Sequence, residues 1–353
     1  MVLEIVSLTK RYSGFTLGPL NLKINREVLV MIGPTGSGKT TLLNIIAGMI
    51  RPDGGSVILD GSDITELPLE SRRIGYVFQT PNLFPHLNVY DNIIFGVSRR
   101  DRQRKSHYVR KILDEMGLSH ISNRDIQGLS GGEMQKVSIA RMLVVEPRII
   151  LLDEPLVHLD PFIRRKLRLE LRRILKMQGI PAIYVTHYED DVYALADSVA
   201  VLRNGSIENA GRLEEILSSN SSPFISEIVE GSNYIEGVVV ESKNGIAVIK
   251  VGMHLLKTLG EYGVNSRLGI LIRPEDILLS REAIKTSARN VIKARVAGIR
   301  EMANLTDVQL QTDSLHLRCR ITAEARTELS LMRDDQVYAI FKATSPQVVR
   351  EES

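Results

Sequence analysis

The feature that most constrains this chain is a glycine-rich loop at residues 33–40, which reads Gly-Pro-Thr-Gly-Ser-Gly-Lys-Thr. It follows an apolar run at 28–32 and precedes a helical run at 41–49, the context that a phosphate-binding loop requires. Glycines let backbone N–H groups turn toward phosphate oxygens, and the N-terminus of the next helix favours negative charge. We therefore expect Lys39 to neutralise nucleotide β- and γ-phosphates and the Thr40 hydroxyl to hold Mg²⁺. The predicted ATP contacts in this region are Gly33, Pro34, Thr35, Gly36, Ser37, Gly38, Lys39, Thr40 and Thr41.

The bulk composition is that of a globular protein, 43% hydrophobic and 25% charged, and a length of 353 residues suits two or three domains. The net charge of +3 is too small to predict nucleic-acid binding. The single cysteine, Cys319, excludes an internal disulfide and fits a reducing compartment. We find no apolar run of about 18 residues, and Glu4 interrupts what would be the apolar core of a signal peptide. We therefore expect the chain to reach a membrane only by docking onto a protein that crosses it.

Two patterns of secondary structure divide the chain. Residues 1–218 alternate short apolar runs with helical stretches, which predicts a mostly parallel α/β sheet. A polar stretch at 218–223 reads as a loop. After it short strands follow closely, which predicts small β-barrels, and segments 236–278 and 293–349 suggest an internal repeat of low identity. The predicted domains are an α/β nucleotide-binding domain at 1–225, a linker at 226–234 and an all-β tandem barrel domain at 235–353.

Two acids end the apolar run at 149–152. Asp153 and Glu154 point in different directions because side chains alternate along a strand. Asp153 suits the Mg²⁺ shell, through water, and Glu154 suits the activation or orientation of an attacking water. The alternative is an acidic strand end that faces solvent, and the phosphate loop upstream makes it the weaker interpretation.

Two further side chains are candidates for the same site. His187 ends the predicted strand at 182–186, on the edge where open α/β sheets bind ligands, so it could contact the γ-phosphate and the attacking water. Gln79 lies in the loop after residues 76–78 and could join the Mg²⁺ shell. The alternatives are a structural histidine and an ordinary loop amide.

A second anion-binding helix end is predicted at residues 129–133, Leu-Ser-Gly-Gly-Glu. Ser130 can cap a helix that we expect at 134–143, and Gly131 and Gly132 expose backbone N–H groups. One nucleotide does not need two such helix ends from one domain, whereas a dimer would use both. Without the other motifs a plain N-cap would be the preferred interpretation.

Together these motifs resemble the ATPase family of ABC transporters over about residues 1–225. The order is the family's order: phosphate loop, Gln79, signature loop at 129–133, Asp153 with Glu154, and His187. The resemblance implies a P-loop domain with a helical subdomain, and a homodimer in which two subunits sandwich and hydrolyse two ATP molecules with Mg²⁺.

The resemblance also implies partners and further contacts. Tyr12 would stack on adenine, and Asp160 would couple the two sites of the dimer. A groove near Gln79, including segment 82–86, would receive a short helix from each of two transmembrane permease subunits at the cytoplasmic face of the membrane. Two departures stand out: Glu133 replaces a commoner Gln, and Val157-His158 replaces small residues. Neither removes a catalytic group, so we expect an active ATPase.

The C-terminal part resembles the tandem barrel domain of importer ATPases, and segment 271–276 matches a motif common there. Segments 286–296 and 337–345 resemble the molybdate-binding barrel module. A tetrahedral dianion such as molybdate or tungstate is bound by hydrogen-bond donors and positive charge. The resemblance implies import of such an oxyanion, delivered by an external binding protein, with feedback inhibition when the anion binds the C-terminal domains. The candidate oxyanion residues are Ser287, Arg289, Asn290, Lys342, Thr344 and Ser345.

Three alternatives stay open. The chain could serve a sugar or sulfate importer, with the barrels as a scaffold. It could be a soluble ABC ATPase whose barrels bind nucleic acid. The C-terminal part has few aromatic residues and no dense basic run, and both features argue against this alternative. It could be an oxyanion store with an inactive ATPase, which intact Lys39, Asp153, Glu154 and His187 argue against.

Overall fold

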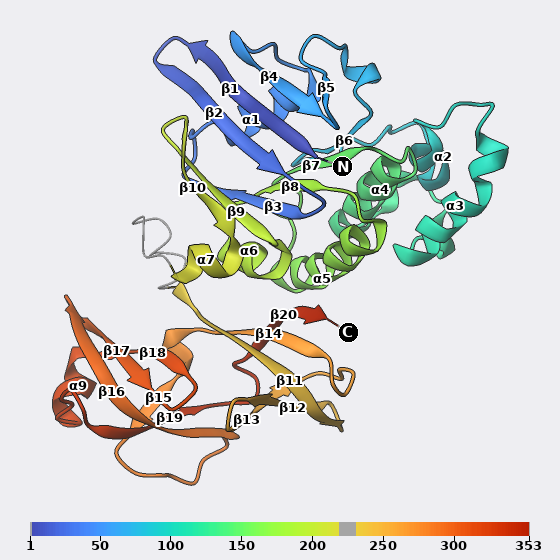
Figure 1. Ribbon diagram of the computed structural model, residues 1–353. Coiled ribbons are helices and arrows are strands. Elements are labelled where there is room, and N and C mark those ends of the chain that lie inside the picture. The colour runs from blue at the N-terminus through green and yellow to red at the C-terminus, as the bar shows by residue number, and fades with distance from the viewer. Residues whose placement is uncertain (1, 219–230, 353) are drawn as a thin grey trace. The chain divides into compact units, whose positions relative to one another are not determined.

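The computed structural model describes residues 2–218 and 231–352 of the chain. It divides into two compact units, Met1–Ser222 and Pro223–Ser353 (Figure 1). Residues 226–230 of the predicted linker lie outside the described residues, so the linker and the boundaries at 225 and 235 stay predictions. Within the described residues, no helix has the length and apolar character needed to cross a bilayer.

The N-terminal unit combines two sheets with helices. Its strands are β1 (Leu3–Tyr12), β2 (Phe15–Ile24), β3 (Val28–Ile32), β4 (Gly54–Leu59), β5 (Ser62–Asp63), β6 (Ile74–Val77), β7 (Ile149–Asp153), β8 (Ala182–Val185), β9 (Ser198–Arg203) and β10 (Ser206–Arg212). Its helices are α1 (Lys39–Ala47), α2 (Val89–Ile94), α3 (Arg102–Glu115), α4 (Gly131–Leu143), α5 (Pro161–Gln178), α6 (Glu189–Leu195) and α7 (Leu213–Ser218), with 3-10 turns η1 (Leu69–Ser71), η2 (Ser119–Ile121) and η3 (Ile126–Gly128).

A six-stranded sheet in the order β10-β9-β3-β8-β7-β6 carries the nucleotide motifs. Every neighbouring pair is parallel except β10 with β9. All residues of β3, β7 and β8 are buried, as expected of strands covered on both faces. The prediction of a mostly parallel α/β sheet is therefore confirmed.

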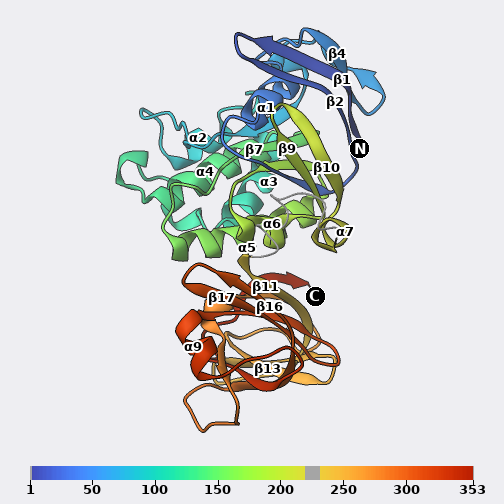
Figure 2. The same cartoon turned by 90° about the vertical axis from the view of Figure 1, so that its left-hand side faces the viewer.

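Helix α1 lies between this sheet and a four-stranded antiparallel sheet, β2-β1-β4-β5 (Figures 1 and 2). One core joins Leu42 and Ile46 of α1 to Ile5 of β1 and Met31 of β3. Helices α5 and α6 cover the other face of the six-stranded sheet, and α2, α3 and α4 form a helical group beside it (Figure 1). Burial on both sides thus fixes the axis of α1.

The bounds of two helices differ from the prediction. α1 ends at Ala47 rather than at 49 because Gly48 adopts φ 89° and donates its N–H to Asn44 O and Ile45 O. α4 begins at Gly131 rather than at 134 because Ser130 is its N-cap, and the Ser130 side chain accepts a hydrogen bond from Glu133 N. Both differences arise from cap geometry, which periodicity alone does not report.

Buried Arg72 closes the C-terminal end of α1, a role that the sequence did not reveal. Its guanidinium donates to Ile45 O and Ile46 O at 2.8 Å each, and to Leu67 O at 2.9 Å. The last carbonyls of a helix lack partners in a following turn, so the arginine supplies donors to Ile45 O and Ile46 O beside the bond from Gly48 N to Ile45 O. A Cβ at Gly48 would lie 2.6 Å from Arg72 Nε, which leaves room only for glycine.

The C-terminal unit consists mostly of strands. They are β11 (Asn233–Lys243), β12 (Ile246–Val251), β13 (His254–Leu259), β14 (Arg267–Ile272), β15 (Leu278–Ser280), β16 (Asn290–Met302), β17 (Leu305–Gln311), β18 (His316–Thr322), β19 (Gln336–Phe341) and β20 (Gln347–Glu352), with η4 (Pro274–Asp276) and α9 (Ala323–Glu328). They form two five-stranded antiparallel sheets, β13-β12-β11-β14-β20 and β15-β19-β16-β17-β18, around one shared core (Figure 2).

The two sheets have equivalent topology, which supports the suggested repeat. In each, a central strand pairs with a hairpin on one side and with a single strand on the other: β11 with β12–β13 and β14, and β16 with β17–β18 and β19. The fifth strands are exchanged, because β15 follows β14 but pairs with β19, and β20 follows β19 but pairs with β14. The exchange is symmetrical, so β20 completes the first sheet although it follows β19 of the second.

Equivalent asparagines tie each sheet to the other. Asn290, at the start of β16, accepts from Lys257 N at 2.7 Å and donates to Lys257 O at 3.0 Å, on β13. Asn233, at the start of β11, makes the same pair of bonds with the backbone of Arg318 on β18. Both asparagines are buried. Each thus provides the polar partners of an edge strand that belongs to the opposite sheet.

We predict that Asn290→Ala lowers the free energy of unfolding of the C-terminal unit by about 1–3 kcal/mol, because the backbone N–H and C=O of Lys257 both lose the Asn290 side chain as a partner. Hydrogen exchange at residues 254–259 of the full chain should accelerate with it. Asn304→Ala, at an exposed site, is the control. Equal exchange in the two variants would contradict the structural role given to Asn290.

Candidate nucleotide site

The phosphate loop turns sharply after β3. A Cβ at Gly33 would lie 1.9 Å from Leu202 O, and a Cβ at Gly38 would lie 2.6 Å from Leu17 Cδ1, so both positions require glycine. Gly38 has φ 105° and is the N-cap of α1, with no side chain capping the helix. The first N–H groups of α1 are therefore available to a ligand, and an anion is the ligand that such an end favours.

Lys39 points back into its own loop. Its Nζ donates to Gly33 O at 2.8 Å and to Pro34 O at 3.0 Å, and lies 3.5 Å from Ser37 Oγ. Burial lowers the pKa of Lys39, while the carboxylates of Glu154 and Asp153 act in the opposite direction. The ammonium thus lies where phosphate oxygens could replace the two carbonyls as its partners.

Asp153 joins β7 to the first turn of α1. Thr40 Oγ1 donates to Asp153 Oδ1 at 3.2 Å, and the Tyr76 hydroxyl lies 3.3 Å from Asp153 Oδ2. The same hydroxyl lies 3.2 Å from Asn44 Oδ1 on α1. Burial raises the pKa of Asp153, against the two hydrogen bonds, which lower it. The structure thus brings together Thr40 and Asp153, two of the three side chains predicted to hold Mg²⁺, and adds Tyr76 and Asn44, for which the sequence carried no signal.

Glu154 and His187 face each other across the ends of β7 and β8. Glu154 Oε1 lies 3.2 Å from His187 Nδ1. Glu154 has φ 46°, unusual for a residue with a side chain, and donates its N–H to Val185 O at 3.0 Å. A neutral His187 ring that donates from Nδ1 has Nε2 as an acceptor, so donation from Nε2 to a phosphate requires release of Glu154 or protonation of the ring.

A buried acid positions the segment that carries His187. Asp191 accepts from Thr186 Oγ1 at 2.7 Å, from the Tyr184 hydroxyl at 3.1 Å and from Arg168 Nε at 2.7 Å. Thr186 Oγ1 in turn accepts from Tyr188 N, on the other side of the histidine. Asp191 therefore fixes the end of β8, although the sequence showed only one of three acids in a row.

The loop after β6 holds Gln79, which is exposed, and its predicted part in the Mg²⁺ shell stays a prediction. The next residues are tied down from the helical group. Arg141 of α4 donates to Pro81 O and Asn82 O at 3.1 Å each. Buried Asn92 accepts from Phe84 N at 2.8 Å and donates back to Phe84 O. Segment 82–86, the predicted docking surface, is thus held by two side chains that sequence reasoning missed.

The predicted signature loop forms the N-terminus of α4. Ser130 is the N-cap: its Oγ accepts from Glu133 N at 3.3 Å and donates to Glu133 Oε2 at 2.7 Å. Gly132 packs against α5, where a Cβ would lie 2.8 Å from Ile163 Cγ2. Asp160 caps α5, accepting from Phe162 N and Ile163 N. Ser130 and Asp160 thus both have structural roles within the monomer.

Tyr12, the predicted adenine contact, ends β1 and is 44% exposed. Lys10 Nζ lies 5.9 Å from the centre of its ring. The exposed ring face fits the predicted stacking, and the structure leaves that stacking a prediction.

Comparison with known proteins places this site in a family. A family model described as ABC transporter matches residues 17–157, and one described as TOBE domain matches residues 286–346. The chain is 40% identical over 350 residues to the molybdate/tungstate import ATP-binding protein WtpC of Pyrococcus horikoshii, covering 98% of this chain and 99% of that protein. The chain belongs to the ABC transporter ATP-binding family. It is an ABC-type ATPase, and the matched ABC transporter segment includes the phosphate loop at 33–40.

Two further proteins illustrate the breadth of this ABC family. The sulfate/thiosulfate import ATP-binding protein CysA of Bacillus cereus is 34% identical over 349 residues, covering 96% of each chain. A structure described as the ADP conformation of MJ1267, an ATP-binding cassette of an ABC transporter, has a TM-score of 0.56 and 29% identity. It covers 64% of this chain and 97% of that one. The resemblance read from the motifs is therefore confirmed.

In the C-terminal unit of this ABC ATPase, the two predicted oxyanion segments lie side by side, because Asn290 pairs with Phe341. Most of the candidate side chains are free to meet a ligand: Ser287, Arg289, Lys342 and Thr344 are exposed, and Ser345 is half-buried. The Asn290 amide is the exception, since backbone groups already occupy it. This geometry favours a structural role for Asn290 over the predicted anion contact.

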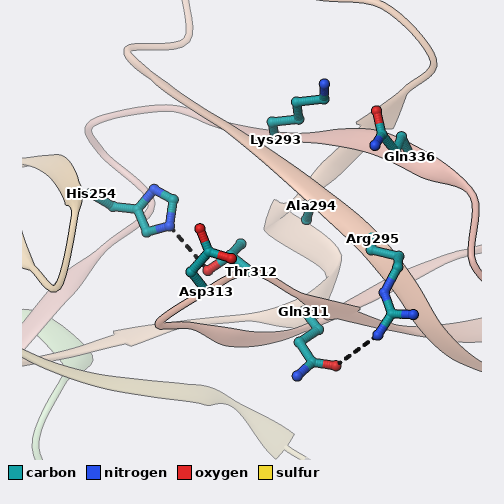
Figure 3. Close-up of a pocket in the computed structure, with 8 residues that line it drawn as sticks. All are labelled: His254, Lys293, Ala294, Arg295, Gln311, Thr312, Asp313 and Gln336. Carbon is teal, nitrogen blue, oxygen red and sulfur yellow. Dashed lines mark hydrogen bonds between the residues drawn. The ribbon is translucent and has the colours of Figure 1, made fainter.

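A separate pocket of about 660 Å³ opens on the same unit (Figure 3). Arg295 Nη1 lies 2.7 Å from Asp334 Oδ1, and His254 Nε2 lies 3.0 Å from Thr312 Oγ1. The lining carries Lys293 and Arg295 with the acid Asp313, and the charge of Arg295 is already paired with Asp334. The lining residues are His254, Lys293, Ala294, Arg295, Gln311, Thr312, Asp313 and Gln336, which include none of the predicted oxyanion residues.

We predict that Gly38→Ala weakens ATP binding by about tenfold or more, because the new Cβ meets Leu17 and the positive φ disfavours a side chain. Titration calorimetry with ATP measures the effect. Gly61→Ala is the matched control, with φ 76° and no atom within 4 Å of its Cβ position. Equal affinities for the two variants would show that the tight turn at Gly38 does not shape the site.

Proposed function

We propose that this chain is the ATP-hydrolysing subunit of an importer for a tetrahedral oxyanion, molybdate or tungstate. The observation that carries the proposal is the likeness to the Pyrococcus horikoshii protein named for molybdate/tungstate import, which extends through both units at 40% identity. A likeness confined to the ATPase unit would support the energy source without indicating the cargo.

The residues of the nucleotide site fit ATP with Mg²⁺. The uncapped N-terminus of α1 and Lys39 supply the positive end of the site, and Thr40 with Asp153 offers oxygens to a hard cation. Bound Mg²⁺ would neutralise charge that develops on the phosphates. Glu154 would accept a proton from the attacking water or orient it, and His187 would position that carboxylate through Nδ1.

The signature loop supports a homodimer. α1 and α4 each present a helix end suited to an anion, and one ATP does not need both from one subunit. In the proposed dimer the Ser130 loop of each subunit closes over the ATP of the other, and Asp160 lies near the junction. The segment at 82–86, with Phe84 held by Asn92, would dock one permease subunit on each ATPase subunit, so that the dimer holds two at the cytoplasmic face of a membrane.

The proposed anion sensor uses the adjacent ends of β16 and β19. Lys342 supplies the charge, and the hydroxyls of Ser287, Thr344 and Ser345 supply donors, with Arg289 nearby. Binding of the transported anion between two C-terminal units would keep the ATPase sites apart and slow import.

The test of the cargo is calorimetric titration of the full chain with tungstate, molybdate and sulfate, with and without ATP and Mg²⁺. Binding of tungstate or molybdate but not sulfate supports the proposal. The full-length likeness to the Bacillus cereus sulfate/thiosulfate protein makes sulfate the second candidate, and preferential sulfate binding would favour it.

We predict that Lys342→Ala weakens tungstate binding by about tenfold, because an exposed ammonium that partners a dianion is lost. Lys243→Ala is the control, an exposed lysine with a weak 4.0 Å contact to Glu241. The anion affinity of each variant is measured by calorimetry. An unchanged affinity in Lys342→Ala would place the anion elsewhere.

We predict that Glu154→Gln lowers the ATP hydrolysis rate by about 10²–10⁴-fold and leaves ATP affinity nearly unchanged, because the amide cannot accept a proton. Single-turnover hydrolysis and ATP titration of the same preparation separate the two effects. Retained hydrolysis would remove Glu154 from the proposed role.

A further inference from the structure

The carboxylate of Glu133 occupies the donors of the signature loop. Glu133 Oε2 accepts from Ser130 N at 2.8 Å and from Ser130 Oγ at 2.7 Å. The two hydrogen bonds hold the pKa of Glu133 below its ordinary range, and the charges of Arg124 and His120 act in the same direction. The side chain is thus a carboxylate at neutral pH, seated on the helix end that the dimer would offer to a phosphate.

This arrangement differs from the N-terminus of α1. Gly38 leaves the first N–H groups of α1 without a side-chain partner, whereas α4 carries a reciprocal capping box between Ser130 and Glu133. A serine hydroxyl has one proton to donate, and in the monomer it is donated to Glu133. It cannot be donated to a phosphate oxygen at the same time.

We infer that Glu133 is an internal competitor for the phosphate at the signature loop and raises the ATP concentration needed to close the dimer. The inference rests on the proposed function, in which the Ser130 loop meets the partner's ATP. Closure then requires the hydroxyl to leave the carboxylate, and it brings two anions to one helix end, where they repel each other. Glu133 is a positioning residue here, because it acts through Ser130.

A substitution that keeps the shape of the capping box but removes its charge tests this inference. Glu133→Gln retains an oxygen that can accept from Ser130 N. The readout is the ATP concentration for half-maximal dimerisation of the full chain, measured by sedimentation in a Glu154→Gln background that holds ATP unhydrolysed. The double variant is expected to need about three- to tenfold less ATP than Glu154→Gln alone.

Two controls separate this effect from others. Glu66→Gln removes one exposed charge elsewhere in the same unit, where its 3.9 Å contact with Arg51 is weak, and should leave the half-maximal concentration unchanged. The thermal midpoint without ATP should fall slightly in Glu133→Gln, because the depressed pKa of Glu133 means that its charge stabilises the fold. A purely structural cap would lower that midpoint and leave the ATP dependence of dimerisation unchanged.

The outcomes are distinct for the inference and for the function beneath it. Dimerisation of the double variant at the same or higher ATP concentration, with the parent dimerising normally, overturns the role of Glu133 alone. A parent that binds ATP without dimerising overturns the proposed sandwich, and the role of Glu133 with it.

Discussion

The nucleotide site depends on a helix N-terminus that no side chain caps. α1 can keep its first N–H groups free because burial between two sheets fixes its axis, and because Arg72 satisfies carbonyls at its other end. Thr40 then links this open end to Asp153 on β7. Packing, rather than a local cap, therefore prepares the site for phosphate.

Buried polar side chains also hold segments in place at a greater distance from the nucleotide site. Asp191 fixes the strand end that carries His187, and Asn92 fixes the loop proposed to dock the permease. Asn233 and Asn290 tie the two sheets of the C-terminal unit to each other. In each case one side chain forms hydrogen bonds with two or more groups, so its removal would destabilise the whole segment that it holds.

The two helix ends proposed to meet phosphate in the ATPase unit are in opposite states. The end at Gly38 is open, and the end at Ser130 is filled by the chain's own carboxylate. An ATP molecule would meet the first without rearrangement but would have to displace a contact at the second. The open end at Gly38 suits ATP binding. The filled end at Ser130 suits control of closure of the proposed dimer.

The sequence by itself determined the element types and the chemistry of the nucleotide site. A glycine-rich loop favours positive φ values, and short, fully apolar runs bounded by turns favour buried strands, so the phosphate loop and the sheet strands were found from local pattern. The motif order of the ABC family then indicated the acids, the signature loop and the dimer.

Only the tertiary structure decided which side chains support that site. Tyr76 and Arg72 lie far in sequence from Asp153 and from Ile45, the groups they contact. Asn92 and Asp191 contact Phe84 and Thr186 nearby in sequence, but an isolated polar residue carries no local mark of its partner. The same holds for the exchange of β15 and β20 and for the amide of Asn290, predicted as an anion contact but bound to backbone. The local sequence pattern indicates which interactions a side chain can make. Tertiary packing decides which partner it makes them with.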